Sequence, residues 1–391
     1  MMNKNNSEFT DSNDILRDTV VEVDLSALAD NLKMIKEMVG PDVSVMTVVK
    51  ANGYGHGAVG IAPTLIENGS AYLAVATLTE ALDLKRAYPD FPVFILGHTP
   101  DRLLGYVVDN NITQTIFDFS QAQKLNELAS EAGKKAAVHI KVDTGFHRLG
   151  KEPSTEYAEE ILKICALENV YVEGIFSHLA LASREDNEKQ FEAFTSFVSM
   201  LESKGCTFKY KHIADSIALV DYPEYRMNMV RPGALLYGMQ GFHIGYLGVK
   251  QVMTFYTRIS QLHHIAKGEG VSYDFLWKAQ RDSIAATLPF GYADGYPRNL
   301  RDKGYVIIEG IKCPLIGVLC MDQVIADVTD VPNVHEGMKA VIYGDGTDGS
   351  MTIAEASSLA GTNKNDIIAR IAARPPRVYV RTNDKNRKNL A

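Results

Sequence analysis

The sequence has few cysteines, no long hydrophobic run and no excess of positive charge, and each shortage excludes a class of protein. Its four cysteines are scattered, without the spacing of a metal site or of a disulfide framework. No apolar run approaches the ~18 residues that a membrane-spanning helix needs. The formal net charge of −8 argues against a nucleic-acid-binding surface. The hydrophobic fraction of 46% is that of an ordinary soluble enzyme.

The two ends of the chain are polar. Residues 1–18 contain no apolar core of a signal peptide, so we expect them to be a flexible lead-in to a cytoplasmic protein. Residues 386–391 are expected to be a frayed tail. The chain between them is longer than one domain core usually allows, which predicts two domains.

Short apolar runs alternate with helical patterns through the first half of the chain. A helix is expected near 26–38, and capping-box patterns at Thr77 and Ser120 mark the starts of two more. Eight runs predict strands at 44–50, 71–76, 92–96, 113–117, 136–142, 170–176, 208–213 and 227–230. This alternation favours a (β/α)₈ barrel at 19–245 over an open doubly wound sheet. In such a barrel, catalytic groups lie where the strands end.

After residue 238 the pattern changes to short apolar runs separated by Gly, Asp and Pro. These runs predict strands at 252–262, 283–288, 305–308, 315–318, 323–328, 339–343 and 377–380, with short helices near 353–359 and 365–372. The predicted fold is therefore α/β, a TIM-like barrel followed by a C-terminal mostly-β domain at 246–385.

One stretch at the end of the first barrel strand carries the strongest functional signal. Residues 48–57 read VVKANGYGHG, so Lys50 follows an apolar run and precedes a glycine-rich turn that lets the backbone approach a ligand. A lysine is almost never buried without a partner, so this one either surfaces at a rim or works as an amine. The stretch resembles the motif of alanine racemases in which a lysine amine forms a Schiff base with pyridoxal 5'-phosphate. The resemblance implies that Lys50 holds this cofactor.

Two arginines follow in the order that alanine racemases have. The segment HIKVDTGFHRLG resembles the part of the family in which the residue matching Arg148 faces the phenolic oxygen of the cofactor and the substrate. The residue matching Lys141 is often carbamylated in the family, and a plain ion pair is the alternative. The resemblance also implies that Arg231, in MVRPG, faces the pyridine nitrogen with His178 in support. A guanidinium cannot protonate that nitrogen, which suits a simple proton exchange at Cα.

Donors for the phosphate group of the cofactor come from three other positions. The resemblance assigns this role to Tyr54, Ser216 and the backbone near Gly233. Amides at a helix start and a glycine-rich turn form a suitable anion cradle. Asp215 stands where an asparagine is expected beside the serine, and its role stays open.

Racemisation needs a proton-transferring group on each face of the substrate Cα. Lys50 would serve one face, and Tyr273, in GVSY, resembles the second base of the family. A tyrosine with a pKa of ~10 needs neighbours that favour its phenolate, and the alternative role is that of a domain-interface aromatic. In the family this tyrosine comes from the partner subunit. The resemblance therefore implies a homodimer with shared active sites.

The remaining matches lie near the substrate. The segment GYADGY resembles the access channel of the family, with Tyr292 as its inner gate. The segment LCMDQ resembles the loop whose Met321 backbone amide meets the substrate carboxylate, and Cys320 and Asp322 line the same pocket. The resemblance implies an amino acid as substrate and no metal.

One position departs from the family pattern. Asn365 stands where alanine racemases usually carry a tyrosine beside the lysine, the cofactor and the substrate. Asparagine is smaller and offers a donor and an acceptor, which favours a hydroxylated substrate. Serine racemases associated with vancomycin resistance resemble the chain here, although they carry a membrane domain. The alternative is that Asn365 is only a helix N-cap.

The predicted function is pyridoxal-phosphate-dependent interconversion of L- and D-alanine, and also of L- and D-serine, which supplies D-amino acids for peptidoglycan. A racemase mainly specific for serine is one alternative. A decarboxylase built on a similar barrel would want an acidic partner at the ring nitrogen, where Arg231 is expected. A pyridoxal-phosphate homeostasis protein would resemble the barrel alone.

Overall fold

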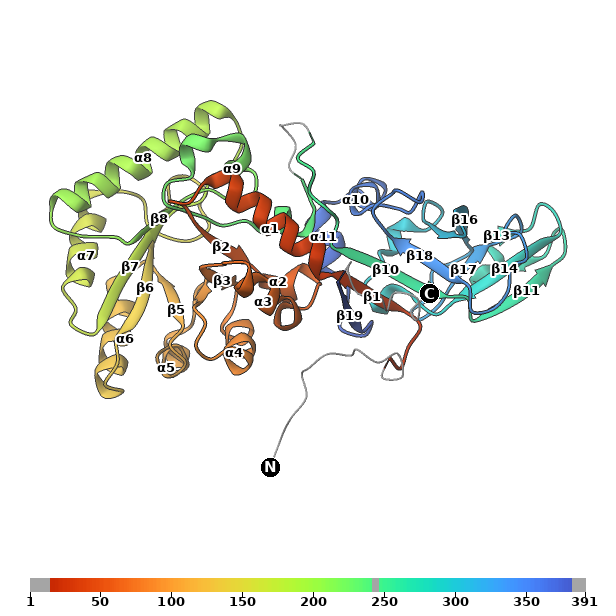
Figure 1. Cartoon of the computed structure of the whole chain (residues 1–391), viewed down its shortest axis with the longest axis horizontal. Coiled ribbons are helices and arrows are strands. Elements are labelled where there is room, and N and C mark those ends of the chain that lie inside the picture. The colour runs from red at the N-terminus through yellow and green to blue at the C-terminus, as the bar shows by residue number, and fades with distance from the viewer. Residues whose placement is uncertain (1–14, 241–245, 382–391) are drawn as a thin grey trace.

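The computed structural model describes residues 15–240 and 246–381, so the predicted tail and residues 1–14 of the lead-in lie outside the described residues. Figure 1 shows two parts side by side, a barrel of strands surrounded by helices and a part built mostly of strands. The helices are α1 (Leu25–Val39), α2 (Lys50–Tyr54), α3 (Ala58–Glu67), α4 (Leu78–Ala87), α5 (Leu104–Asp109), α6 (Phe119–Glu131), α7 (Thr155–Cys165), α8 (Arg184–Ser203), α9 (Ala218–Asp221), α10 (Ile353–Ala360) and α11 (Lys364–Ala369). Across these described ranges, no helix is both long and apolar enough to span a membrane.

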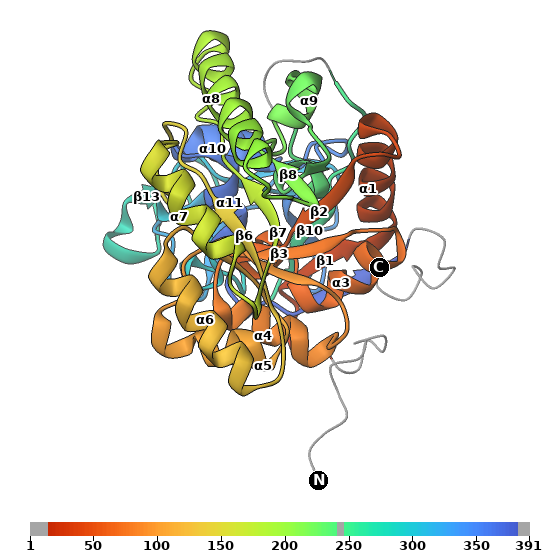
Figure 2. The same cartoon turned by 90° about the vertical axis from the view of Figure 1, so that its left-hand side faces the viewer.

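Parallel strands form the barrel in the order β8-β7-β6-β5-β4-β3-β2-β9. They are β2 (Ser44–Val48), β3 (Tyr72–Val75), β4 (Val93–Ile95), β5 (Thr113–Ile116), β6 (Ala136–Lys141), β7 (Val170–Phe176), β8 (Tyr210–His212) and β9 (Met229–Val230). The two ends of this sheet meet at Asn228, whose side-chain amide accepts from the N–H of Lys211 and donates to the carbonyl of Lys209. Figure 2 shows helices α4 to α8 around the strands. The predicted TIM-like barrel is confirmed.

The starts of the barrel helices follow from capping side chains. Thr77 forms the predicted capping box at the start of α4, in which its hydroxyl accepts from the N–H of Glu80. The prediction for Ser120 was wrong, because Asp118 is the N-cap of α6. The Asp118 carboxylate accepts from the N–H of Gln121 and also from the Ser120 hydroxyl. Aspartate is a favoured N-cap residue, and here Asp118 caps the helix rather than the predicted Ser120.

The second part of the chain is a mostly-β domain, as predicted. Its main sheet has the strand order β11-β14-β17-β16-β15-β18-β10-β1-β19, and a two-stranded hairpin of β12 and β13 lies beside it. The strands are β1 (Val20–Asp24), β10 (Met253–Arg258), β11 (Gln261–Ile265), β12 (Gly270–Val271), β13 (Trp277–Lys278), β14 (Ser283–Leu288), β15 (Tyr305–Ile308), β16 (Ile311–Ile316), β17 (Val324–Asp327), β18 (Lys339–Tyr343) and β19 (Arg377–Val380).

Strand β1 connects the two parts. The range predicted for the barrel, 19–245, includes this strand, whereas its pairing places it in the sheet of the second part. It pairs antiparallel with β10 and parallel with β19. The chain therefore starts in the second sheet, enters the barrel through α1 and returns through β10, as Figure 1 shows. This crossing brings α11, near the end of the chain, against α2 at the barrel.

The end of the predicted flexible lead-in is anchored by an ion pair. Arg17 makes a two-pronged contact with the carboxylate of Asp294, with N–O distances of 2.5 and 2.8 Å. A third hydrogen bond runs from Arg17 to the carbonyl of Pro289. Asp294 is fully buried and also faces Arg374 at 3.4 Å. Residues 15–18 therefore belong to the folded structure rather than to a free lead-in.

We expect Arg17→Met to lower the free energy of unfolding by about 3 kcal/mol, the lower end of the range for breaking a buried ion pair, because Arg374 still faces the carboxylate. Urea denaturation followed by circular dichroism measures this loss. The matched control is Arg184→Met, because Arg184 pairs with Glu188 and Glu224 on the surface, where such pairs contribute less than about 1 kcal/mol. Equal losses in the two variants would contradict the anchoring role of Arg17.

Candidate active site

Lys50 lies just past the carboxyl end of β2, where it begins α2. The next four residues, 51–54, have φ between 52° and 63°, which makes α2 a left-handed turn. This conformation costs about 1–2 kcal/mol for each residue that has a Cβ. Two side chains stabilise the turn: the Glu80 carboxylate accepts from the N–H of Ala51 at 2.6 Å, and the Asn52 amide accepts from that of Ala58 at 2.9 Å. The chain thus adopts a strained left-handed turn directly after Lys50, at the mouth of the barrel.

The surroundings of Lys50 favour its neutral amine. Burial lowers the pKa of Lys50, and the positive charges of Arg148 and Arg231 lower it further. Glu80 and Asp215 act in the opposite direction, but the net pKa stays below its ordinary value. Because only the neutral amine is a nucleophile, this environment suits a lysine that attacks a carbonyl carbon.

Three of the predicted phosphate-binding residues converge beside Lys50. The Ser216 hydroxyl oxygen accepts from the N–H groups of Gly233 and Leu235, at 2.8 and 3.3 Å. A Cβ added to Gly233 would lie only 2.6 Å from the Tyr54 hydroxyl, so a larger residue there would close this space. Two hydroxyl groups and a run of backbone amides suit a phosphate group, and the residues present therefore fit the phosphate of pyridoxal phosphate.

Asp215, whose role the sequence left open, has a structural contact. Its carboxylate accepts from the N–H groups of Ile217 and Ala218, both at 3.0 Å. This contact fixes the turn that leads from β8 to α9. An asparagine could make the same contact through its side-chain oxygen, so the change from asparagine keeps the turn and adds a negative charge.

Arg231 is buried and held from several sides. One guanidinium nitrogen donates to Nδ1 of His212 at 2.6 Å. The other donates to the carbonyls of Ser177 and Ile213, at 2.8 and 3.1 Å. Burial lowers the pKa of Arg231 to about 10, so the group stays charged at neutral pH. The arrangement fixes a permanent cation in the barrel mouth, where a carboxylate would be expected in a decarboxylase.

His178, which the sequence predicted to support Arg231, makes a longer contact with that arginine than His212 does. Its Nδ1 lies 3.5 Å from Arg231, whereas His212 makes the short contact. Burial, together with the charges of Arg231 and Arg148, lowers the pKa of His178 to about 2, so the ring is neutral. Its ring contacts that of Phe146, over which the guanidinium of Arg148 lies at 4.3 Å. His178 therefore contacts Arg231 through Nδ1 and Arg148 through the ring of Phe146.

Lys141 points toward the same cluster of cations. Its amine donates to the carbonyl of Val142 and lies 5.6 Å from the centre of the Phe176 ring. Burial lowers the pKa of Lys141 to about 7, with Arg231 and Arg148 adding to the effect and Asp143 opposing it. A large neutral fraction is what reaction with carbon dioxide requires.

The remaining predicted residues form a second cluster in the β domain. Tyr292 donates its N–H to the carbonyl of Cys320, and the next residue donates to that of Met321. Ser272, beside Tyr273, donates to the carbonyl of Val318 at 3.0 Å. The hairpin of β12 and β13, the access-channel segment and the 319–323 loop are thereby joined. Asp322 lies at the edge of this cluster, where it accepts from Arg374 at 2.8 Å.

The two clusters do not meet within one chain. In Figure 1, α2 lies at the junction of the two parts, whereas β13 lies well away from it across the second domain. Tyr273 is 68% exposed and Met321 is 52% exposed, and Phe275 and Leu276 beside them are exposed as well. Several exposed large apolar side chains on one face mark an interaction surface. Lys50 and Tyr273 can act on one substrate only if a second chain covers this surface.

Asn365 lies on α11, which packs against α2 close to Lys50. The alternative interpretation of Asn365 as a helix N-cap was wrong. Asn363 is the N-cap, because its side chain accepts from the N–H of Asp366. The side chain of Asn365 is exposed and is therefore available to a ligand.

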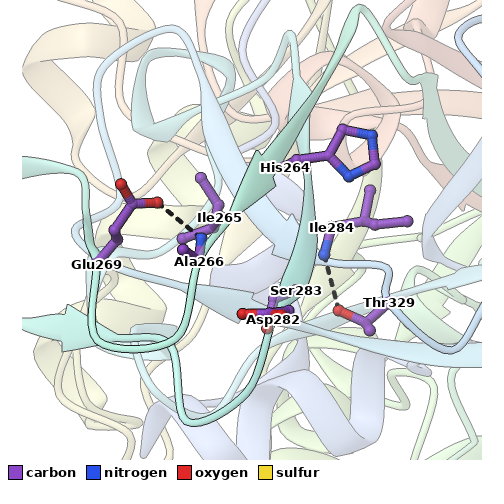
Figure 3. Close-up of a pocket in the computed structure, with 8 residues that line it drawn as sticks. All are labelled: His264, Ile265, Ala266, Glu269, Asp282, Ser283, Ile284 and Thr329. Carbon is purple, nitrogen blue, oxygen red and sulfur yellow. Dashed lines mark hydrogen bonds between the residues drawn. The ribbon is translucent and has the colours of Figure 1, made fainter.

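A hollow of about 510 Å³ lies elsewhere, on the β domain (Figure 3). Its walls come from the turns around β11 and β14. Two acidic side chains of the wall form hydrogen bonds with the backbone: Glu269 accepts from the N–H of Ala266, and Asp282 accepts from that of Lys267. None of the predicted site residues lines this hollow, so it is separate from the candidate active site.

Comparison with known proteins agrees with this geometry. Residues 23–241 match the family profile "Alanine racemase, N-terminal domain", and residues 252–379 match "Alanine racemase, C-terminal domain". The chain is 40% identical over 373 residues to the alanine racemase of Clostridium tetani, a match that covers 94% of this chain and 96% of that protein. The chain belongs to the alanine racemase family. It is therefore an amino-acid racemase, an isomerase.

Solved alanine racemase structures share the whole fold. The enzyme from Clostridium difficile 630 is 33% identical, with a TM-score of 0.90, and the match covers 95% of this chain and 97% of that one. A structure of the Bacillus anthracis alanine racemase with bound L-Ala-P is 30% identical, with a TM-score of 0.86 over 94% of this chain and 96% of that one. These likenesses support both the barrel and the β domain.

Sequence reasoning missed the buried polar residues inside this racemase barrel. They are His139 on β6, Glu173 on β7 and His212 on β8, all buried. The signal that could have found them is a polar residue in the middle of an apolar parallel strand, because such strands are buried on both faces. A buried polar group needs a partner, so several of them on neighbouring strands predict a network.

Proposed function

We propose that this protein interconverts L- and D-alanine by a two-base mechanism in which Lys50 serves one face of Cα and Tyr273 of a second subunit serves the other. The observation that carries the proposal is the buried cation Arg231, held by His212 and two carbonyls where a carboxylate would favour other reactions. Bound pyridoxal phosphate would supply an electron-withdrawing ring that acidifies the Cα proton.

Different residues of the chain would hold different parts of this cofactor. Lys50 would bind its aldehyde carbon, and Tyr54, Ser216 and the backbone at Gly233 would bind its phosphate. Arg231 would face the ring nitrogen as a donor only, which keeps the ring a weak electron sink. Arg148 would stabilise negative charge on the phenolic oxygen and contact the substrate. His178 would cover the site beside both arginines.

Lys141 is proposed to be carbamylated. Its low pKa of about 7 supports the modification, because carbon dioxide reacts with the neutral amine. The resulting carbamate would carry a negative charge toward Arg148 and so orient it. A carbamate signal in the ¹³C spectrum of protein prepared with labelled bicarbonate would identify the modification. The same protein with Lys141→Met should lack that signal.

The separation of the two clusters supports a homodimer with shared sites. The exposed surface around Tyr273 and Met321 would cover the barrel mouth of the partner. Tyr292, Cys320, the Met321 amide and Asp322 would then line the substrate pocket opposite Lys50. The proposed setting is the cytoplasm, and the proposed role is supply of D-amino acids for peptidoglycan.

Proton exchange at Cα separates this function from its alternatives. In deuterated water, L-alanine should give D-alanine with deuterium at Cα and no carbon dioxide. Release of carbon dioxide would indicate the decarboxylase, and binding of pyridoxal phosphate without exchange would indicate the homeostasis protein. Arg231 speaks against the first alternative, and the complete β domain speaks against the second.

Serine is proposed as a further substrate because of Asn365. We expect the ratio of serine to alanine kcat/KM to fall about 5- to 10-fold in Asn365→Tyr, the effect of one hydrogen bond of ~1–1.4 kcal/mol to the serine hydroxyl. Chiral chromatography of both amino acids measures the ratio.

The matched control is Asn363→Asp, which changes the neighbouring asparagine of the same segment and preserves the N-cap of α11. This variant should keep the wild-type ratio. Negligible serine turnover in the wild type, or an unchanged ratio in Asn365→Tyr, would show that Asn365 does not select the substrate.

A further inference from the structure

A chain of buried polar groups runs from Arg231 across the interior of the barrel. Arg231 donates to Nδ1 of His212 at 2.6 Å, and Nε2 of His212 lies 2.9 Å from Nδ1 of His139. Nε2 of His139 then faces the Glu173 carboxylate at 3.7 Å. The three residues beyond Arg231 come from neighbouring strands, β8, β6 and β7, and all are buried.

The position of every ring proton in this chain follows from its first contact. A guanidinium can only donate, so Nδ1 of His212 accepts and carries no proton. A neutral His212 is therefore protonated at Nε2, which donates to Nδ1 of His139. His139 in turn carries its proton at Nε2, which points toward Glu173. Burial keeps both rings neutral by lowering the pKa of each.

Glu173 is the last residue of this series of polar contacts, and its carboxylate is a charged acceptor. Its carboxylate receives the Tyr72 hydroxyl and the amine of Lys209, the latter at 3.0 Å. Burial raises the pKa of Glu173, but the nearby His139 ring and the hydrogen bonds from Tyr72 and Lys209 outweigh this and lower it to about 2. The carboxylate is thus ionised, and its charge favours the Nε2–H form of His139. The 3.7 Å separation makes this an electrostatic contact rather than a short hydrogen bond.

We propose that Glu173 is a remote positioning residue for Arg231, acting through the ring protons of His139 and His212. If His139 moved its proton to Nδ1, it would face the Nε2–H of His212, two donors in contact. His212 would then have to move its proton to Nδ1 and could no longer accept from Arg231. Glu173 opposes this change. Its effect on racemisation rests on the function proposed above, whereas the proton positions do not.

The proton positions can be read in the cofactor-free, full-length wild type by ¹⁵N NMR of labelled histidines, with signals assigned by single histidine substitutions. His139 and His212 should both show a pyrrole-type Nε2 and a pyridine-type Nδ1. A charged His212, or a protonated Nδ1 on either ring, would overturn the proposal whatever the enzyme does.

Two substitutions of Glu173 separate positioning from packing. Glu173→Met removes the acceptor, so we expect Nδ1-protonated His139 and His212 to appear and kcat to fall about tenfold, the effect of loosening one charge-assisted hydrogen bond, with KM little changed. Glu173→Gln keeps an oxygen facing Nε2 of His139 but loses the charge, so it should restore only part of the wild-type ¹⁵N pattern and kcat.

The matched control is Lys209→Met, which removes the exposed partner of Glu173 and leaves its carboxylate in place. This variant should keep the wild-type ring protons. Wild-type proton positions in Glu173→Met would overturn the proposal, as would equal losses of kcat in the Met and Gln variants. If the proton positions change in Glu173→Met but kcat does not, Glu173 still positions Arg231, and the role of this positioning in racemisation is contradicted.

Discussion

Replacement of Lys50 by alanine is expected to abolish racemisation, with kcat falling by about 10⁴-fold or more, because the variant loses both the proton carrier on one face and the covalent anchor of the cofactor. Wild-type protein purified with pyridoxal phosphate should be yellow, and borohydride should bleach it irreversibly. Peptide mapping of the reduced protein should find the label on Lys50. The variant should bind the cofactor loosely and release it on gel filtration after the same treatment.

Lys85→Met is the matched control for burial. Burial lowers the pKa of Lys85 as it does that of Lys50, but the Lys85 amine donates to the carbonyls of Pro89 and Phe91, away from the barrel mouth. This variant should keep the label and the activity, even if its stability falls. Label on a lysine other than Lys50 would contradict the assignment.

The parts of the fold that sequence predicted best are those set by local pattern. Most barrel strands are short apolar runs because helices cover one face and the barrel core lies on the other. The Thr77 capping box is likewise a local contact between residues three apart. Lys50 could be placed at a strand end for the same reason, since both the run and the glycine-rich turn adjoin it.

The sequence did not predict the contacts between elements that are far apart along the chain. Nothing near β1 indicates that it pairs with β10 and β19, each more than two hundred residues away in sequence. The local pattern likewise does not indicate that Arg17 contacts Asp294, or that His212 contacts Arg231. Such contacts depend on which elements the finished fold brings together. The resemblance to a family assigned the support of Arg231 to His178, which lies 3.5 Å from it, and did not indicate His212, whose contact with Arg231 is 2.6 Å.

Replacement of Tyr273 by phenylalanine is expected to lower racemisation by about 10²–10⁴-fold, the usual contribution of a general acid or base. The free energies of the two enantiomers are equal, so kcat/KM must fall equally in both directions. The asymmetry should appear in the exchange of the Cα hydrogen with solvent. For one enantiomer, Lys50 can still remove the proton and return a solvent proton to the same face. Mass spectrometry of recovered substrate in deuterated water measures this exchange.

Tyr292→Phe is a matched control, because Tyr292 is another partly exposed tyrosine of the same cluster, with a proposed role in access rather than in proton transfer. It should affect exchange from both enantiomers alike. Racemisation within a few-fold of wild type in Tyr273→Phe would rule out Tyr273 as the second base. Equal loss of exchange from both enantiomers would point instead to a binding role.

Mixing the two inactive variants should recover activity, because the proposed dimer builds each site from Lys50 of one subunit and Tyr273 of the other. In a Lys50→Ala/Tyr273→Phe mixed dimer, one site carries both substitutions and the other carries neither. With equal amounts and random exchange in a two-fold symmetric dimer, about a quarter of the sites should be intact. Mixing either variant with the double variant should recover nothing. If native mass spectrometry shows exchanged subunits and activity stays absent, each site must be built within one chain, and the exposed surface around Tyr273 must serve another purpose.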